Sequence, residues 1–289
     1  MCDGEKIFSI EVDQFTVTIF PMLIHYCALM GKLYIDSTLW MYAVRDIINH
    51  LVASLRLNDV MGADLVTMST GKTHGYDCAE SVGTYDIAIC WHSSVAHHDM
   101  GLSLRFGATD WHVYCDNWET MYGTRMTFWR LWHMLSSSLY TMRISRLDIA
   151  ADFFNFDDVS PHSLYAGIED GTLSVLTDEG HIPCRTRRGY TSDGICETLE
   201  VGSRHSDVFL VAYDKRLQSI RLHGPFYNTA LSCRSWLRLE TRYKHNLAHA
   251  IGRDMTQICD DDTYLSYLAQ KSVERFGFYT EGDDSDETD

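Results

Sequence analysis

Two aspartates and an arginine occupy one face of a predicted strand near the middle of the chain. The segment Arg-Leu-Asp-Ile-Ala-Ala-Asp at 146–152 places Arg146, Asp148 and Asp152 on the same side, because side chains alternate along a strand. Carboxylates on one face repel each other, and the pair persists most easily beside a metal ion or a basic side chain. Two interpretations follow: a divalent-metal site, or a solvent-facing strand on which Arg146 neutralises one acid.

A second predicted strand carries a carboxylate between two arginines. In Trp-Leu-Arg-Leu-Glu-Thr-Arg at 236–242, alternation places Arg238, Glu240 and Arg242 on one face. A site that handles phosphodiesters uses such a set, because the carboxylate holds a cation and the arginines bind phosphate oxygens. The alternative is a surface ladder of ion pairs, which is the commoner use of this pattern.

A third segment, 200–216, combines a turn, a hydrophobic strand and a tyrosine. Arg204 and Ser206 follow a Gly-Ser turn and suit contacts with phosphate. A tyrosine hydroxyl, with a pKa of about 10, becomes a nucleophile where a cation or base favours the phenolate. The ordinary alternative is a core ring with a hydroxyl that reaches water. The strand ends at Tyr213, and the charged residues directly after it are Asp214, Lys215 and Arg216.

The net charge is acidic, but its distribution is uneven. The 289 residues include 24 Lys or Arg and 40 Asp or Glu, a formal charge of −16. This balance argues against a protein that coats nucleic acid by bulk charge. The segment from Arg185 to Arg253, however, holds twelve basic and six acidic residues. We expect an anionic partner to bind there; a plain solvated face is the alternative.

Other features of the composition bear on location. No apolar run approaches the length of about eighteen residues that a membrane span needs, and the first residues do not resemble a signal peptide. The nine cysteines are scattered without a Cys-x-x-Cys pair, which fits neither a zinc site nor a disulfide framework. We therefore expect a cytoplasmic protein with reduced thiols and no membrane contact.

Strands and helices are intermixed without a repeated strand–helix unit. This order predicts an α+β fold, with a central and largely antiparallel sheet flanked by helices. We expect one domain over 1–278 and a disordered acidic tail over 279–289. Periodicity predicts strands at 12–19, 85–91, 102–106, 145–153, 198–201, 208–213 and 236–242. The predicted helices are 37–55, 116–135, 161–171, 245–253 and 263–274, with a loop or hairpin over 57–80.

The charged segments, taken in order, resemble Rep_trans-type replication initiators. This family comprises rolling-circle plasmid initiators with related phage proteins and relaxases of conjugative elements. Upstream, 99–107 is similar to the family's glycine-bounded strand and 12–19 to its opening strand, so the resemblance covers roughly residues 10–250. The matching elements are Arg-Leu-Asp-Ile-Ala-Ala-Asp at 146–152, Val-Gly-Ser-Arg-His-Ser at 201–206, Ala-Tyr-Asp-Lys at 212–215 and Arg-Leu-Glu-Thr-Arg at 238–242.

The resemblance implies a replication-initiator (nickase) fold and a site-specific, topoisomerase-like DNA endonuclease and strand transferase. Tyr213 matches the nucleophile, which attacks one phosphodiester, stays joined to the 5′ phosphate and leaves a 3′ hydroxyl for synthesis. The family requires a divalent metal, Mg²⁺ or Mn²⁺. Our first choice of metal ligands is Asp148 with Glu240. Asp214 can be a ligand only if the strand bends, because alternation otherwise places it on the face opposite Tyr213. The candidate metal ligands are Asp148, Asp152, Asp214 and Glu240. The residues expected to contact DNA are Arg204, Ser206, Lys215, Arg216, Arg238 and Arg242.

The implied partners are origin DNA, as a hairpin or single-stranded nick site, and by analogy with relatives a host helicase and a second copy of the chain. Because the net charge is acidic, we expect weak non-specific binding with steep salt dependence. Three other tyrosines compete with Tyr213 as nucleophiles, but none lies in the matching element: Tyr190, Tyr227 and Tyr243.

Two alternatives remain beside the nickase. A catalytically inactive DNA-binding regulator of the same fold would lack the acids or Tyr213, and all are present. A sugar hydrolase using paired carboxylates leaves the arginines without a role. Other tyrosine nickases bind metal through a His-hydrophobic-His triplet, which this chain lacks, since His97 and His98 are adjacent and His92 lies five residues earlier.

Overall fold

The computed structural model describes residues 4–22, 36–69, 75–176, 186–190 and 193–280, with the backbone alone for 186–190. The chain forms two compact units. Unit 1 comprises Met1–Glu11, Asp148–Lys244 and Cys259–Asp289, and unit 2 comprises Val12–Leu147 and His245–Ile258. Two long strands, β1 (Ile7–Pro21) and β6 (Tyr140–Phe154), contribute residues to both units.

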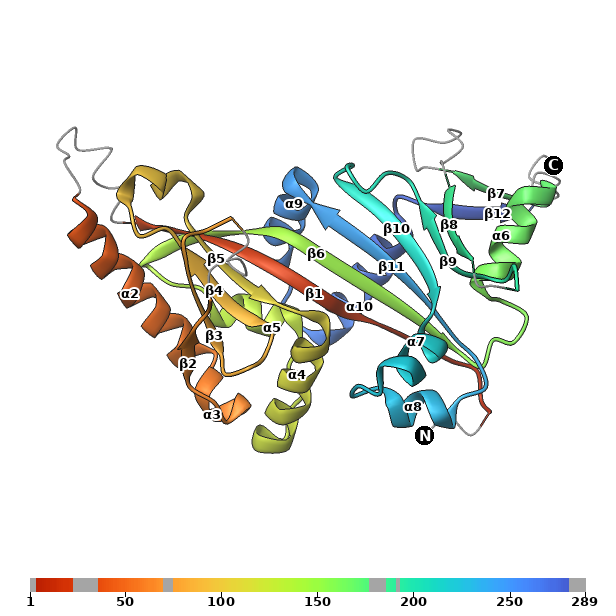
Figure 1. The fold of residues 1–289 in the computed structure, drawn as a ribbon, viewed down its shortest axis with the longest axis horizontal. Coiled ribbons are helices and arrows are strands. Elements are labelled where there is room, and N and C mark those ends of the chain that lie inside the picture. The colour runs from red at the N-terminus through yellow and green to blue at the C-terminus, as the bar shows by residue number, and fades with distance from the viewer. Residues whose placement is uncertain (1–3, 23–35, 70–74, 177–185, 191–192, 281–289) are drawn as a thin grey trace. The chain divides into compact units, whose positions relative to one another are not determined.

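Unit 1 is built on a sheet whose order is β1-β6-β11-β10-β9-β8 (Figure 1). The pairs β11–β10, β10–β9 and β9–β8 are antiparallel. A separate antiparallel pair joins β7 (Leu173–Leu176) and β12 (Gly277–Thr280). The remaining strands of the sheet are β11 (Trp236–Lys244), β10 (Val208–Asp214), β9 (Cys196–Val201) and β8 (Thr186–Tyr190).

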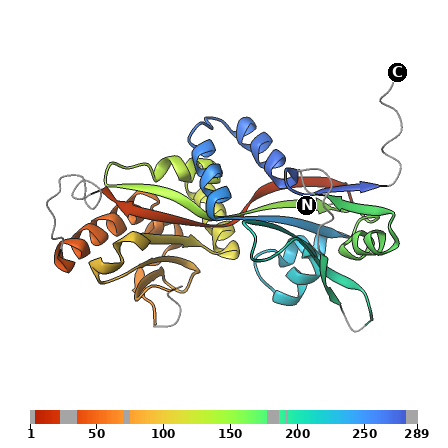
Figure 2. The same ribbon diagram turned by 90° about the horizontal axis from the view of Figure 1, so that it is seen from above.

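Helices cover both faces of this sheet. Both α7 (Lys215–Leu222) and α10 (Asp261–Val273) pack against β11, and they lie on opposite sides of the strands (Figure 2). Leu199, Leu210 and Leu237 face an apolar core shared with α6 (Pro161–Asp170), so the opposite face is left for the charged residues. Helix α8 (Tyr227–Ser232) follows α7.

Unit 2 contains the strand order β2-β3-β4-β5-β1-β6, with antiparallel pairing from β2 to β1. Buried aromatic side chains fill its core, and Trp111 donates from its indole to the Val12 carbonyl over 2.9 Å. The strands particular to this unit are β2 (Leu65–Thr67), β3 (Cys78–Val82), β4 (Ile87–Trp91) and β5 (Leu102–Phe106). Its helices are α2 (Ser37–Ser54), α3 (Leu57–Met61), α4 (Ala108–Tyr122), α5 (Phe128–Met134), α9 (His245–Met255) and the short 3₁₀ helix η1 (Val95–Met100).

The predicted antiparallel sheet flanked by helices is confirmed, and most of the elements that were predicted lie near their predicted residues, whereas α7 and α8 were not predicted. Helix α6 illustrates why: Ser160 caps it, Pro161 occupies its first turn and Gly171 ends it in the left-handed conformation. The predicted helix over 116–135 is wrong, because Gly123, with a φ of 69°, ends α4 and a new helix starts at Phe128.

The predicted glycine-bounded strand corresponds to β5, and its first glycine has a steric reason. Gly101 has a φ of 65°, and a Cβ there would collide with the Ile19 carbonyl of β1. Residues 279 and 280, which we placed in the tail, belong to β12, and 281–289 lie outside the described residues. The single domain over 1–278 stays a prediction beside the two compact units.

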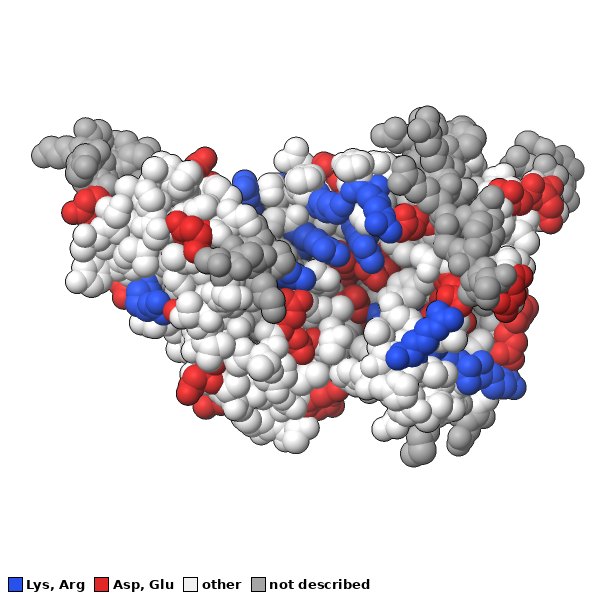
Figure 3. Space-filling view, in the orientation of Figure 1, with Lys and Arg blue, Asp and Glu red and all other residues white. Residues whose placement is uncertain are grey.

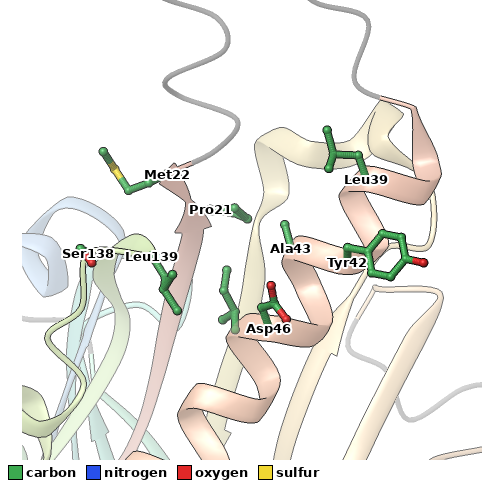
Figure 4. Close-up of a pocket in the computed structure, with 9 residues that line it drawn as sticks. Pro21, Met22, Leu39, Tyr42, Ala43, Asp46, Ser138 and Leu139 are labelled. Atoms are coloured by element: carbon green, nitrogen blue, oxygen red, sulfur yellow. The ribbon is translucent and has the colours of Figure 1, made fainter.

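An apolar pocket of about 480 Å³ lies in unit 2. Figure 4 shows its lining at the end of β1, along α2 and in the segment before β6. The described residues of its lining include one charged side chain, Asp46. None of the described helices combines the length and the apolar character needed to cross a membrane.

Candidate active site

Tyr213 stands near the end of β10, opposite the charged face of β11. In the antiparallel register Tyr213 pairs with Arg238, and Val211 pairs with Glu240. The Tyr213 hydroxyl donates a hydrogen bond to Glu240 Oε2 over 3.1 Å. The ring is buried, with an exposed fraction of 8%. The hydroxyl therefore has a carboxylate within the reach that a general base requires.

Glu240 is held in place by Arg242. The Nε of Arg242 donates to Glu240 Oε1 over 2.6 Å and lies 3.6 Å from Asp148 Oδ2 on β6. Asp148 is fully buried and Glu240 nearly so. Burial alone would lower the pKa of Arg242, but the negative charges of Glu240 and Asp148 raise it above its ordinary value. One guanidinium thus compensates two buried carboxylates.

Basic side chains gather beside this group. The charged ends of Arg242 and Lys244 lie 5.3 Å and 4.6 Å from the centroid of the Phe209 ring. Lys244 Nζ donates to the Arg204 carbonyl over 2.7 Å. Arg204 is exposed, and its hydrogen bonds to the Glu200 carboxylate raise the pKa of the guanidinium. Figure 3 shows Lys and Arg side chains over the position of β10 and β11, next to acidic ones.

Arg238 and Asp152 form a buried ion pair on the same face. Arg238 donates from Nε and Nη2 to the two oxygens of Asp152 over 2.8 Å and 2.7 Å. The indole of Trp236 donates to Asp152 Oδ1 over 2.6 Å, and Glu11 Oε1 lies 4.0 Å from Arg238 Nη2. Arg238 has no exposed surface. The structure therefore places this predicted ligand and this predicted DNA contact inside the protein, where they join β6 to β11.

The residues directly after Tyr213 begin α7. Asp214 is the N-cap, and its carboxylate accepts a hydrogen bond from the Leu217 amide over 2.7 Å. This sets the start of α7 but does not bring Asp214 to Glu240 or Asp148. Lys215 is buried, and its Nζ donates to Gln218 over 3.1 Å and lies 5.8 Å from the centroid of the Tyr213 ring.

Two other predicted DNA contacts lie at or near the surface. Arg216 is partly exposed and donates from Nε to the Cys233 carbonyl over 2.9 Å. Ser206 is exposed in the turn before β10, where its amide donates to the Ser203 carbonyl over 3.0 Å. Unlike Arg238, both residues therefore have surface that solvent reaches.

Carboxylate oxygens suited to a divalent cation converge at Arg242. Asp148 Oδ2 and Glu240 Oε1 both lie within 3.6 Å of the same Arg242 nitrogen. Mg²⁺ is commonly held by one or two carboxylates together with substrate phosphates, and this pair fits that arrangement. Over the part of the chain that the structure describes, no group of three or more His, Cys, Asp or Glu could hold a metal ion by itself.

The competing tyrosines and histidines lie in other surroundings. Tyr243 is buried and its hydroxyl donates to the Lys271 carbonyl over 2.5 Å, while Tyr227 belongs to α8. The side chain of Tyr190 lies outside the described residues. The rings of His92 and His97, in unit 2, are 4.5 Å apart.

Comparisons with known proteins assign this charged sheet to a family. The family model described as "Replication initiation factor" (Rep_trans) matches residues 142–288, about half of the chain. The chain belongs to this family. The matched range contains every site residue predicted from the sequence, whereas Glu11 lies outside it.

A solved structure supports the fold of this replication initiation factor over nearly its whole length. The rolling circle replication initiator protein from Geobacillus stearothermophilus matches with a TM-score of 0.59 and 15% sequence identity. The match covers 97% of this chain and 90% of that one. At that identity the likeness shows a shared fold. A comparison with curated proteins gives no significant match.

Sequence reasoning did not single out Glu11, Trp236 and Phe209 as parts of the site. Glu11 is a residue of β1, on which side chains alternate between the two faces of the sheet. This alternation could have indicated the face on which Glu11 lies. Its approach to Arg238 depends on the strand order of the sheet, which the local pattern does not carry. Phe209 and Trp236 read as ordinary core residues of hydrophobic strands.

The buried ion pair yields a stability prediction. Asp152→Ala leaves the Arg238 guanidinium buried without its main partner, so we expect the free energy of unfolding to fall by about 3–5 kcal/mol. Asp157→Ala removes an exposed ion pair with Arg234 and should cost about 0–1 kcal/mol. Urea unfolding followed by circular dichroism measures both; equal losses in the two variants would contradict this role of Asp152.

Proposed function

We propose that this replication initiation factor nicks one strand of origin DNA by the rolling-circle mechanism, with Tyr213 as the nucleophile. The observation that carries the proposal is the hydrogen bond from the Tyr213 hydroxyl to Glu240, whose other oxygen is fixed by Arg242. A nucleophile, a base within hydrogen-bond reach and a third group that orients the base form the arrangement expected of covalent catalysis.

The reaction follows from these contacts. As the Tyr213 oxygen attacks phosphorus, its proton passes to Glu240 Oε2, and the bond from phosphorus to the 3′ oxygen breaks. The 3′ oxygen takes a proton from solvent and becomes a hydroxyl, while the 5′ phosphate remains on the tyrosine. Attack by a 3′ hydroxyl on this phosphotyrosine reverses the exchange and rejoins a strand, so the same site performs strand transfer.

Arg242 is suited to receive the phosphate. Its side chain keeps an exposed fraction of 28% while it pairs with Glu240 and Asp148. Guanidinium groups bind phosphate oxygens in a bidentate way. Arg204, Ser206 and Arg216 are accessible for contacts with neighbouring phosphates, whereas Arg238 supports the site from inside.

Asp148 and Glu240 are the residues that would hold a divalent cation, Mg²⁺ or Mn²⁺. Such an ion, when bound, supplies positive charge to the phosphate oxygens. The two carboxylates are already organised around one positive charge, that of Arg242. Asp152 is saturated by Arg238 and Trp236, and Asp214 caps α7, so we give both of them supporting roles.

Removal of the tyrosine hydroxyl tests the nucleophile. Tyr213→Phe should abolish cleavage of supercoiled origin DNA and leave DNA binding unchanged, because only the attacking oxygen is lost. Tyr243→Phe is the matched control, since its hydroxyl meets a carbonyl in the core. Nicking is followed on agarose gels and binding by mobility shift. Cleavage by Tyr213→Phe at the normal rate would rule out this nucleophile.

The proton acceptor has its own test in the same assay. Glu240→Gln should slow nicking by about 10²–10⁴-fold, which is the range for loss of a general base, while binding persists. If neither the wild type nor the variant cleaves origin DNA that it binds tightly, the protein acts as a DNA-binding regulator and the nickase proposal fails.

The metal assignment predicts a shift in thermal stability. Arg242→Gln leaves Asp148 and Glu240 without their guanidinium, so in EDTA the variant should have a lower Tm than the wild type. On addition of millimolar Mn²⁺, the Tm of the variant should increase by more than that of the wild type. Arg221→Gln, which loses an exposed ion pair with Glu197, is the control. Differential scanning calorimetry measures the effect, and equal responses to Mn²⁺ in both variants would remove this pair of acids as the ligands.

A further inference from the structure

The connection between β10 and β11 differs in charge from the rest of the chain. The 21 residues from 215 to 235 include three Arg and one Lys and contain no Asp or Glu, in a chain whose net charge is −16. This segment forms α7, α8 and the turn between them. Proteins that bind single-stranded nucleic acid combine positive charge with aromatic rings on which bases stack.

Contacts lead from Tyr213 directly into this segment. Lys215 Nζ lies 5.8 Å from the centroid of the Tyr213 ring and 5.0 Å from that of Phe226. Phe226 packs edge-on against Trp236, with ring centroids 5.8 Å apart. Phe226 and the next residue, Tyr227, are both partly exposed. Lys215 thus links the Tyr213 ring to Phe226, the residue before α8.

The turn presents a pair of stacked rings. The rings of His223 and Tyr227 have centroids 4.6 Å apart and an interplanar angle of 19°. His223 is exposed, as are Arg221 and Leu222 beside it; Leu222 has an exposed fraction of 72%. Aromatic side chains at the surface are groups on which nucleobases stack.

The backbone at His223 is unusual for its residue type. His223 ends α7 with a φ of 51°, in the left-handed region where glycine is the usual residue. A side chain in this conformation carries a cost that glycine avoids. A His223→Gly substitution therefore removes the imidazole ring without straining the backbone.

We propose that the His223–Tyr227 ring pair is a stacking platform for an unpaired base of the strand that is nicked. The platform holds the single strand by its bases, while Arg216 on the same helix meets the phosphates. This inference rests on the proposed function, since it names the form of DNA that the nicking site accepts. In this proposal the α7–α8 turn is the part of the protein that recognises unpaired bases.

The experiment compares two oligonucleotides that share phosphates and differ in bases. Fluorescence anisotropy measures binding of a labelled oligothymidylate of about 20 nucleotides and of an abasic oligomer of the same length, at one salt concentration. Stacking predicts that the wild type binds oligothymidylate at least about tenfold more tightly. His223→Gly should reduce this preference by about fivefold or more and leave binding of the abasic oligomer unchanged.

The variants separate stacking from folding. Glycine suits the φ of His223, so His223→Gly should keep or raise resistance to urea. His245→Gly is the matched control, because His245 is also an exposed histidine with a positive φ, 47°, and its binding should equal that of the wild type. Tyr227→Leu, which removes the second ring, should weaken oligothymidylate binding in the same way as His223→Gly.

Two outcomes overturn the inference. The stacking role is wrong if the wild type binds both oligomers equally, or if His223→Gly keeps the wild-type preference for oligothymidylate. The proposed nickase survives either result if Tyr213 still forms a covalent adduct with origin DNA. Absence of binding to either oligomer, together with absence of the adduct, removes the proposed function itself and the platform with it.

Discussion

The arrangement of this site depends on the compensation of buried charge. Asp148, Asp152, Arg238 and Glu240 are almost fully buried on one face of the β6–β11–β10 sheet, and a charge in such surroundings is tolerated only beside an opposite one. Arg238 pairs with Asp152, and Arg242 pairs with Glu240 and Asp148. The two pairings fix the lateral positions of β6 and β11, and through them the position of Tyr213.

The two ion pairs differ in exposure, and this difference separates support from chemistry. The pair of Asp152 and Arg238 is buried beneath Trp236 and the neighbouring strands. Its role is therefore to hold β6 and β11 in position. Arg242 keeps a quarter of its side chain in solvent and shares its charge between two acids. Under the proposed function, a phosphate can therefore reach Arg242, whereas Arg238 is closed to it. The Tyr213 hydroxyl is linked to this pair through its hydrogen bond to Glu240.

Much of the site was predictable because strand alternation is a local property. The period of two placed Asp148 with Asp152, and Arg238 with Glu240 and Arg242, on common faces without knowledge of the fold. The partners were not predictable, because they depend on which strands become neighbours. Strand alternation indicated Arg146 as a partner for an acid of its own strand, whereas arginines of β11 pair with both Asp148 and Asp152. Asp214 was similarly ambiguous until the start of α7 showed it as a cap.

The central claim is that Tyr213 becomes joined to DNA, and the direct measurement is the site of the covalent adduct. Purified protein is incubated with supercoiled DNA of its own replicon and Mg²⁺ or Mn²⁺, the product is denatured and digested, and the nucleotide-bearing peptide is sequenced by mass spectrometry. The account predicts a 5′-phosphotyrosine link on the peptide that contains Tyr213. A link on Tyr227 or Tyr243, or cleaved DNA without any link, would contradict it.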